Sequence, residues 1–285
     1  TVFSGRITDI EVNPKDPSKF YVAYASGGLW YTANNGTTFE PIFDNEAVMT
    51  IGDIAVNWNA GIIWVGTGEN NSSRSSYAGL GMYKSSDMGK TWDYAGLPES
   101  HHIGRIVLDP DDMNTLWVAV LGHLYSPNSD RGVYKTTDGG ETWSRTLFVN
   151  DNCGAVDLVM DPSDPDKLYA AMWERKRRAW NFSEAGPGSG IYKSIDGGDN
   201  WNLLTDKNSG FPSGDGVGRI GLDITIEGGQ VVIGAILDNY FRRAKTAEEE
   251  TSILNKDALR EMTSQEFLTL EEEDIQEFLD EYNFP

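Results

Sequence analysis

The chain has 285 residues, 39% hydrophobic and 11% aromatic, so it can bury a substantial core and is not expected to be disordered. Its formal net charge of −21 excludes the broad basic surface that nucleic-acid-binding proteins use, and we expect no nucleic acid partner. The single cysteine, Cys153, excludes an intrachain disulfide, and no apolar run in the sequence is long enough to span a membrane.

In chain order, four segments repeat the same succession of short strand patterns. Each opens with an apolar strand ending in Asn or Asp, turns into a second strand, and reaches a third strand through a connection of variable length. The first strands are expected at residues 7–14, 51–58, 103–110 and 155–162. The third strands lead into eight-residue boxes, TANNGTTF (32–39), SSDMGKTW (85–92), TTDGGETW (136–143) and SIDGGDNW (194–201). Four short antiparallel strands in every ~40–50 residues predict an all-β protein, a β-propeller of four-stranded blades.

The chemistry of the box is that of a tight turn. Asp138 can accept hydrogen bonds from its own turn, and Gly140 can adopt the positive φ that a hairpin often needs. Thr136 and Thr142 are placed to bond across the hairpin, while Trp143 can pack between sheets. Calcium binding is the alternative, but each box usually supplies one carboxylate, too few for that ion. The structural box residues are expected to be Asn35, Asp87, Gly89, Trp92, Asp138, Gly140, Trp143, Asp196, Gly198 and Trp201.

A fifth unit begins at residues 217–224 and 230–238, but its third strand and box do not follow. The sequence becomes acidic and helical instead, with capping-box spacing at Thr263/Glu266 and Thr269/Glu272. An apolar stripe then follows at Ile275, Phe278, Leu279 and Tyr282. We expect blades over residues 1–240 and an acidic helical insertion or tail over 241–285. The stripe packs against the propeller or, alternatively, binds a partner. The propeller is expected to be incomplete, with the remaining blades of a longer chain as its partner.

In a four-stranded meander the boxes share one rim, and the second-to-third-strand connections share the opposite rim. Three of those connections are long, at residues 67–81, 121–132 and 172–190. The last places Arg175, Lys176, Arg177 and Arg178 between Trp173 and Trp180, a combination that suits a carboxylate-bearing or sugar ligand. The alternative is that these cations pair with neighbouring acids and the tryptophans cover the core. The predicted ligand-binding residues are Glu69, Asn70, Arg74, Tyr77, His123, Tyr125, Arg131, Trp173, Arg175, Arg177, Arg178 and Trp180.

Arg6, Arg105 and Arg219 share a place near the start of a first strand, so they line the central channel or form salt bridges to the next blade. We favour the salt bridges. The histidines fall in or beside the long-connection rim, where Glu69, His101 and His102 could hold a metal. We favour neither a metal nor a cofactor, and no catalytic residue can be assigned.

The boxes resemble the Asp-box, or bacterial neuraminidase repeat, of sialidases, xyloglucan-active glycosidases and the sortilin luminal domain. The resemblance covers about residues 5–240 and implies a propeller, whereas it is shared by enzymes and receptors. The sialidase start motif is absent. VNPKDPSKFYVAYASGGLW (12–30) has the spacing of the xyloglucan-active family, but the first catalytic Asp of that family would lie at Ala25.

Because Ala25 cannot act as an acid or base, we favour a non-catalytic, sortilin-like propeller that binds a protein, peptide or glycan ligand on the long-connection rim. The alternative is a glycoside hydrolase, sialidase-like or xyloglucanase-like, acting on extracellular glycans. The resemblance implies an extracytoplasmic location.

Overall fold

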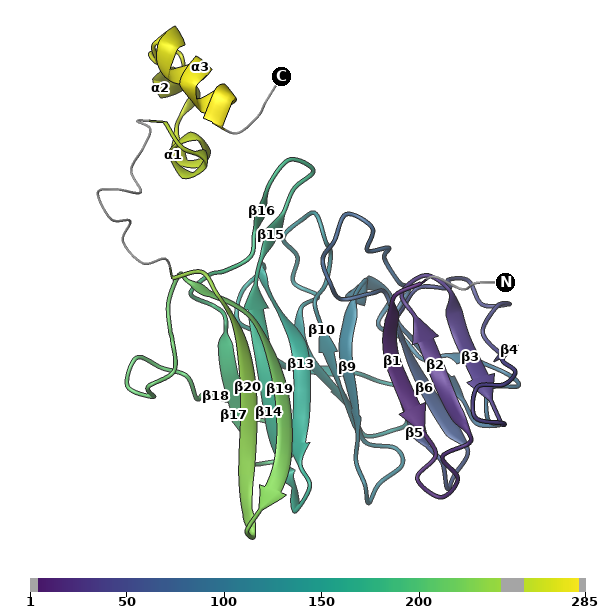
Figure 1. Cartoon of the computed structure of the whole chain (residues 1–285). Coiled ribbons are helices and arrows are strands. Elements are labelled where there is room, and N and C mark those ends of the chain that lie inside the picture. Colours follow the sequence, from purple (N-terminus) through teal and green to yellow (C-terminus); the bar gives the residue numbers. More distant parts are fainter. Residues whose placement is uncertain (1–4, 242–253, 282–285) are drawn as a thin grey trace. The chain divides into compact units, whose positions relative to one another are not determined.

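The computed structural model describes residues 5–241 and 254–281. The chain divides into two compact units, Thr1–Phe241 and Arg242–Pro285. Strands dominate the first unit and three short helices form the second (Figure 1). None of the described helices is both long and apolar enough to cross a membrane.

The first unit contains four antiparallel sheets of four strands each, and we call each sheet a blade. The first blade has β1 (Ile7–Val12), β2 (Phe20–Tyr24), β3 (Gly28–Thr32) and β4 (Glu40–Pro41). The second has β5 (Ile51–Asn57), β6 (Ile62–Thr67), β7 (Met82–Ser85) and β8 (Asp93–Tyr94). The third has β9 (Ile103–Leu108), β10 (Leu116–Val120), β11 (Gly132–Thr136) and β12 (Ser144–Leu147). The fourth has β13 (Cys153–Asp161), β14 (Asp164–Glu174), β17 (Gly190–Ser194) and β18 (Asn202–Leu203). The predicted all-β propeller of four-stranded blades is therefore confirmed.

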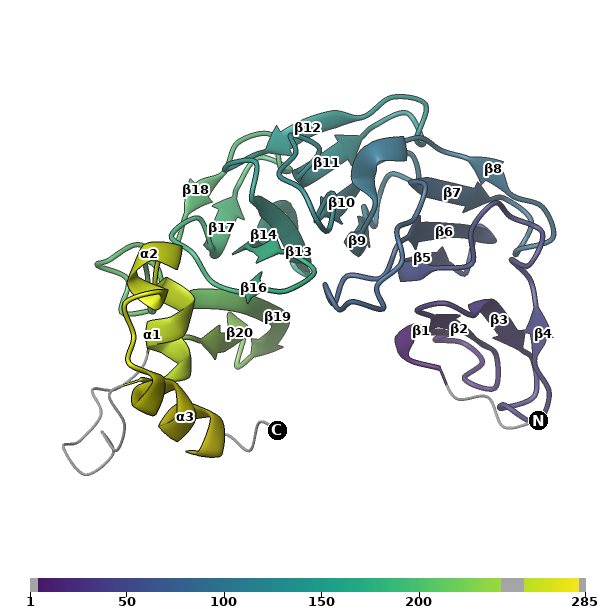
Figure 2. The ribbon, with the colours of Figure 1, turned by 90° about the horizontal axis from the view of Figure 1, so that it is seen from above.

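The blades follow one another in an arc with their first strands innermost (Figure 2). Each first strand contacts the first strand of the next blade, from β1 through β5, β9 and β13 to β19 (Val217–Glu227). The second strands pack between neighbouring blades, which is why β10 is buried along its whole length rather than on alternate residues. Trp64, Ile103 and Val118, from successive blades, belong to one such buried cluster.

Each box forms a closed hairpin turn around its aspartate. Asp138 Oδ1 accepts from Thr136 Oγ1 (2.7 Å) and Thr142 N (2.9 Å), and its Oδ2 accepts from Thr142 Oγ1 (2.5 Å). Both threonines thus bond to the aspartate, not directly across the hairpin. These hydrogen bonds lower the pKa of Asp138 to about 2, and similar bonds do the same for Asp87 and Asp196. Gly140 has φ +92° and lies against Trp64.

The first box differs from the prediction by one residue. Asn34, not Asn35, occupies the aspartate position, because its Oδ1 accepts from Thr32 Oγ1 (3.1 Å) and Thr38 N (2.9 Å). Asn35 has φ +56°, as Met88 has +64° in the second box. Asparagine tolerates this left-handed conformation better than most residues, which explains two successive asparagines in the box.

The box tryptophans connect each blade to the preceding one. Trp92 Nε1 donates to the Ile42 carbonyl (2.7 Å), and Trp143 Nε1 donates to the Ala95 carbonyl (2.7 Å). Trp201 Nε1 reaches Thr146 Oγ1 at 3.1 Å. Each acceptor lies in or just after the fourth strand of the blade before, so the box joins blades as well as strands.

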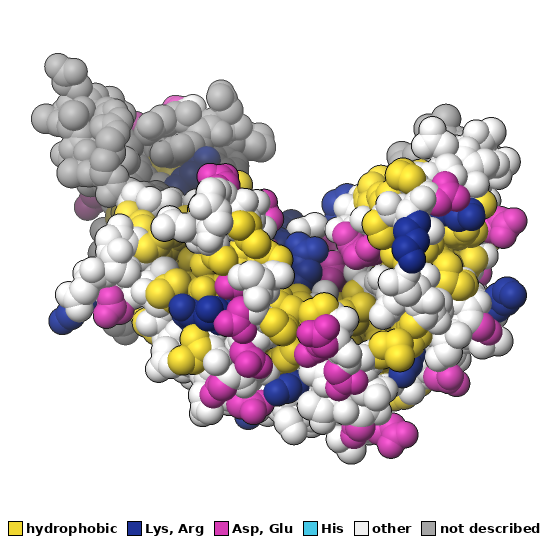
Figure 3. Space-filling view, turned by 90° about the horizontal axis from the view of Figure 1, so that it is seen from below, with side chains coloured by type: hydrophobic (Ala, Val, Ile, Leu, Met, Phe, Trp, Pro, Cys, Tyr) yellow, Lys and Arg dark blue, Asp and Glu magenta, His cyan; other side chains and the backbone are white. Residues whose placement is uncertain are grey.

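The face seen in Figure 3, on the side of the box hairpins, shows acidic, basic and hydrophobic side chains interspersed.

Charged residues at one position of the inner strands add a second connection. Asp53 Oδ2 accepts from the backbone N–H of Ile106 in the next blade (2.7 Å). In the third blade the same position is Arg105, whose Nη1 lies 3.3 Å from Asp53 and whose Nε lies 3.1 Å from Asp157. Arg105 therefore joins the blades on both sides. Burial raises the pKa of Asp53 well above its usual value, and Arg105 opposes that shift.

The expected fifth unit forms a hairpin of β19 and β20 (Gln230–Asn239), and within residues 5–241 no third strand joins it. The second unit has α1 (Lys256–Glu261), α2 (Ser264–Phe267) and α3 (Glu272–Glu281). The capping box of Thr263 and Glu266 is present. Thr269 differs from the prediction, because its hydroxyl donates to the Glu266 carbonyl (2.7 Å). In the predicted stripe Phe278 is buried, and Tyr282 lies outside the described residues.

Candidate functional site

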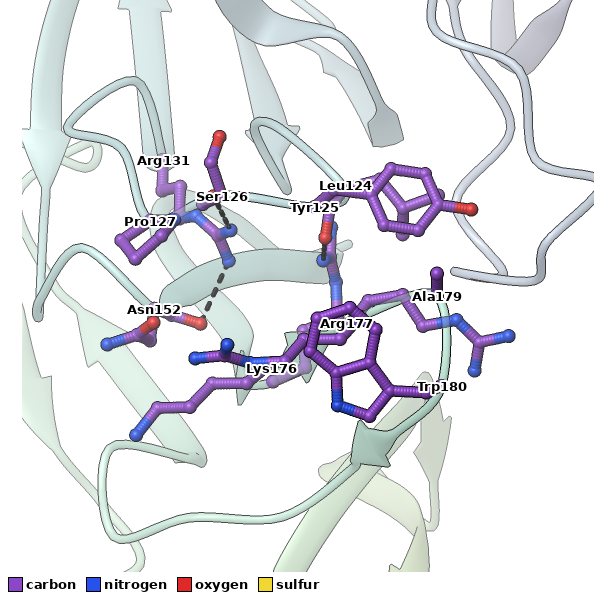
Figure 4. Close-up of a pocket in the computed structure, with 12 residues that line it drawn as sticks. Leu124, Tyr125, Ser126, Pro127, Arg131, Asn152, Lys176, Arg177, Ala179 and Trp180 are labelled. Carbon is purple, nitrogen blue, oxygen red and sulfur yellow. Dashed lines mark hydrogen bonds between the residues drawn. The ribbon is translucent and has the colours of Figure 1, made fainter.

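Two long connections form a cavity on the rim opposite the boxes. They join β10 to β11 and β14 to β17, and the second contains a small hairpin of β15 (Lys176–Arg177) and β16 (Phe182–Ser183). The cavity has a volume of about 770 Å³ (Figure 4). Of the residues predicted to bind a ligand, it brings together Tyr125, Arg131, Arg175, Arg177, Arg178 and Trp180.

Arg131 is a buried part of this wall, with 1% of its surface exposed. Its Nε donates to Asn128 Oδ1 (2.8 Å), its Nη1 to the Asn152 carbonyl (2.9 Å) and its Nη2 to the His123 carbonyl (2.8 Å). These acceptors are neutral, so the guanidinium fixes the 121–132 connection without having its charge neutralised. The sequence analysis did not single out Asn128 or Asn152. Asn152 contributes a backbone carbonyl, which carries no sequence signal, and Asn128 contributes an ordinary side-chain amide three residues from Arg131.

Arg175 is equally buried, at 1% exposure, but it has few partners. Its Nη1 donates to the Leu124 carbonyl (3.3 Å), while its Nε and Nη2 have no hydrogen-bond partner. Burial, with Arg131 and Arg219 nearby, lowers the pKa of this guanidinium, although arginine keeps its charge at neutral pH. The predicted alternative, pairing with neighbouring acids, does not describe Arg175.

The two tryptophans of the 172–190 connection have different environments. Trp173 is 3% exposed, donates to the Glu184 carbonyl (2.7 Å), and has the guanidinium groups of Arg175 and Arg219 near its ring. It supports the site from the core and does not present its ring to a ligand. Trp180 is 77% exposed, and its ring and that of Tyr125 lie at the cavity (Figure 4).

A second group of predicted residues lies on the 67–81 connection. Glu69 is fully buried, and its Oε2 lies 3.0 Å from Arg6 and accepts from the Ser76 hydroxyl. Its Oε1 has no partner. Asn70 accepts from Arg219 Nη2 (3.2 Å), which connects this loop to β19. Arg74 is exposed, and it does not line the cavity between the 121–132 and 172–190 connections.

Tyr77 and Arg6 line a separate cavity of about 540 Å³, together with Ala25. Ala25 is buried, and its N–H donates to the Arg6 carbonyl (2.9 Å). The three central arginines thus differ in their partners. Arg105 bridges two aspartates, Arg6 pairs with Glu69, and Arg219 bonds to Asn70 and Asn71. We predicted that these arginines form salt bridges to an acid on the next blade. This is confirmed for Arg6 and Arg105, whereas Arg219 bonds to asparagines instead.

The histidines do not assemble with Glu69 as a metal set. His102 is buried, with its Nδ1 2.8 Å from the Glu69 carbonyl, and burial lowers its pKa to about 3. His101 stacks on His123 with ring centroids 3.8 Å apart. His101, His123 and Glu99 have potential ligand atoms within 4.8 Å of one another. Among the described residues, this group is the one that could hold a metal ion. His123, predicted to bind a ligand, does not line the cavity described above, although its backbone carbonyl accepts a hydrogen bond from Arg131.

Comparison with protein families identifies the repeat. The profile of the BNR/Asp-box repeat family matches residues 134–145, which contain the third box. A probable oligoxyloglucan-reducing end-specific xyloglucanase of Neosartorya fischeri is 27% identical over 178 residues, which are 56% of this chain and 19% of that protein. A xyloglucanase of Hypocrea jecorina is 28% identical over 182 residues, 56% of this chain and 20% of that protein. The chain thus spans about a fifth of the length of these relatives.

Solved structures agree on the fold. An ancestral GH74 enzyme superposes with a TM-score of 0.56 at 20% identity, over 76% of this chain and 27% of that one. The GH74 xyloglucanase from Xanthomonas campestris gives a TM-score of 0.55 at 17% identity, over 76% and 32%. At these identities the likeness concerns the fold alone. The named relatives are glycoside hydrolases, which favours the alternative stated from the sequence over the sortilin-like receptor.

Proposed function

We propose that this chain, which has a propeller fold and matches the BNR/Asp-box repeat at residues 134–145, is a carbohydrate-active protein of the glycoside hydrolase type. The observation that carries the proposal is its similarity to proteins named xyloglucanases, 26–28% identical over more than half of the chain. The expected substrate is an extracytoplasmic polysaccharide, bound across the long-connection rim.

The rim has the properties that such a ligand requires. Exposed aromatic rings, Trp180 and Tyr125, offer flat apolar faces beside charged and amide groups, a composition typical of ligand sites. The box aspartates Asp87, Asp138 and Asp196 are already engaged by hydrogen bonds within their own turns, so they are weaker candidates for ligand contacts.

Hydrolysis additionally needs carboxyl groups, generally two that lie about 5–10 Å apart. Ala25 supplies none at the place where the xyloglucan-active family would have its first catalytic aspartate. Glu69 is the carboxylate that we assign to this region, because it pairs with Arg6, which lines the same cavity as Ala25. The Oε1 atom of Glu69 is buried and has no hydrogen-bond partner, and an unsatisfied buried carboxylate oxygen of this kind marks a functional candidate. We therefore propose Glu69 as an acid–base residue.

The test is release of reducing ends from xyloglucan and other plant and bacterial polysaccharides by the wild type and by Glu69→Gln. The expected result is turnover that falls at least about 100-fold in the variant, within the range for loss of acid–base catalysis. Glu261→Gln, in α1 of the second unit, is the matched control and should retain activity.

A second candidate function, binding without turnover, is favoured by one observation, the methyl group of Ala25 in place of a carboxylate. It predicts that calorimetry detects polysaccharide binding while no reducing ends appear and Ala25→Asp does not create activity. Absence of both binding and turnover on every polysaccharide would contradict the carbohydrate assignment.

A further inference from the structure

The cavity between the 121–132 and 172–190 connections contains buried positive charge that the chain itself does not neutralise. Arg131 and Arg175 are each 1% exposed. Among residues 5–241 and 254–281, no carboxylate lies within the 4.0 Å of either guanidinium that defines a salt bridge. Buried arginines are normally paired, because removing a cation from water without a counter-charge is costly. These two arginines therefore indicate a site that an anion from outside would complete.

The unpartnered atoms of Arg175 specify the shape of that anion. Nη1 is used by the Leu124 carbonyl, whereas Nε and Nη2 are buried without an acceptor. These two atoms form the side-on edge of the guanidinium, whose parallel N–H groups match the two oxygens of a carboxylate. Arg131, by contrast, has its donors occupied by Asn128 and by backbone carbonyls, so it contributes charge and rigidity rather than free donors.

The surroundings add further positive charge and an aromatic face. Lys176, Arg177 and Arg178 line the same cavity, and Arg177 Nε is also buried without a partner. Trp180 and Tyr125 are more than half exposed at the cavity. An aromatic face beside a guanidinium fork suits a ring that carries a carboxylate, because the ring can stack while the acid reaches the fork.

We propose that this cavity binds the carboxylate of an acidic sugar residue, a uronic acid, with Arg175 as the anion receptor and Trp180 as the stacking surface. The proposal rests on the carbohydrate assignment above and specifies the class of glycan. The cavity is a local exception in an acidic protein. The net charge of −21 repels anions at long range, whereas the cationic side chains that line this cavity attract a carboxylate at short range.

The test is isothermal titration calorimetry of the whole chain with three probes: a trigalacturonate, a neutral xyloglucan oligosaccharide and a sulfated oligosaccharide. The wild type should bind the uronate at least about 10-fold more tightly than the neutral and the sulfated probes, and added salt should weaken that binding. Arg175→Gln should lose at least about 10-fold in affinity for the uronate only, since it removes the fork. Arg175→Lys keeps the charge but not the fork, and should lose nearly as much. Arg260→Gln, in α1, is the matched control and should bind as the wild type does.

Thermal unfolding of the same variants separates a ligand role from a structural one. Removing an unpaired buried cation should leave the Tm of Arg175→Gln unchanged or raised, whereas an arginine retained for stability would give a lower Tm. Equal binding of all three probes, tighter binding of the sulfated probe, or wild-type uronate affinity in Arg175→Gln would each overturn the proposal.

The outcomes also separate this proposal from the carbohydrate assignment. Binding of the neutral probe without the uronate would retain the carbohydrate assignment and overturn the uronate site. Binding of an acidic peptide such as poly-glutamate, dependent on Arg175, with no glycan bound, would overturn both.

Discussion

Replacing Trp143 with alanine tests whether the boxes connect neighbouring blades. The substitution removes a half-buried indole that contacts Trp64 edge to face, with ring centroids 6.5 Å apart, and donates to the Ala95 carbonyl at 2.7 Å. Replacing a core tryptophan with alanine lowers the free energy of unfolding by about 3–5 kcal/mol. Because Trp143 is partly exposed, we expect a loss near the lower end of that range, about 3 kcal/mol. Trp143→Phe keeps most of the packing and loses the hydrogen bond, so it should cost about 1 kcal/mol.

The assay is thermal and urea unfolding followed by circular dichroism. For a unit of this size, a loss of about 3 kcal/mol corresponds to a fall in Tm of about 6–12 °C. Trp180→Ala makes the same chemical change at a side chain that is 77% exposed, and should alter stability by no more than about 0.5 kcal/mol. If Trp143→Ala is no more destabilising than Trp180→Ala, the box tryptophan does not connect the blades.

Three further predictions concern the same framework. Gly198→Ala should lower the free energy of unfolding by about 3 kcal/mol, because φ is +79° and the new Cβ would lie 2.5 Å from Trp117 Nε1. Gly228→Ala, with open space around it, should lower it by about 1 kcal/mol; urea unfolding measures both. Arg105→Met should lower the stability of the fold by about 2 kcal/mol at neutral pH, because it leaves Asp53 as a buried charge without its partner. The loss should be smaller at pH ~5, where Asp53 can bind a proton, and an equal loss at both pH values would contradict this explanation. The box aspartates titrate near 2 when folded against 3.8 when unfolded, so the stability they confer is fully present above pH ~4 and is lost as pH falls towards 2. Asp138→Asn should reduce that acid-dependent slope in unfolding experiments at pH 2–4.

The repeating part of the fold could be predicted because its signals are local and occur several times. The strand, turn and box patterns recur in each blade, so an error in one copy is corrected by the others. The exception is the first box, where TANNGTTF offers two adjacent asparagines. The hydrogen bonds from Thr32 Oγ1 and Thr38 N identify Asn34 as the aspartate equivalent, which leaves Asn35 to supply the positive φ.

The prediction for Thr269 was wrong for a related reason. Its spacing to Glu272 fits a capping box, but its hydroxyl bonds backwards to the Glu266 carbonyl. A spacing rule identifies which groups are able to meet, whereas the backbone conformation between the two short helices decides which of them do.

The candidate site was predictable in position but not in chemistry. Loop length and the cluster at residues 173–180 indicated the rim, and several of these residues line one cavity. The sequence does not distinguish Trp173, which is buried behind Arg175, from Trp180, which is exposed. Nor does it show that neutral acceptors satisfy Arg131 but not Arg175. Arg131 bonds to the local Asn128 and to Asn152 on another segment, whereas the guanidinium of Arg175 bonds only to Leu124, which also lies on another segment.

Hydrogen–deuterium exchange of the whole chain, with and without the bound trigalacturonate, tests most directly whether the long-connection rim binds ligand while the boxes only join blades. We expect reduced exchange in residues 121–132 and 172–190, with no change in the boxes at 85–92, 136–143 and 194–201. Protection of any box, with none in those two connections, would contradict the account.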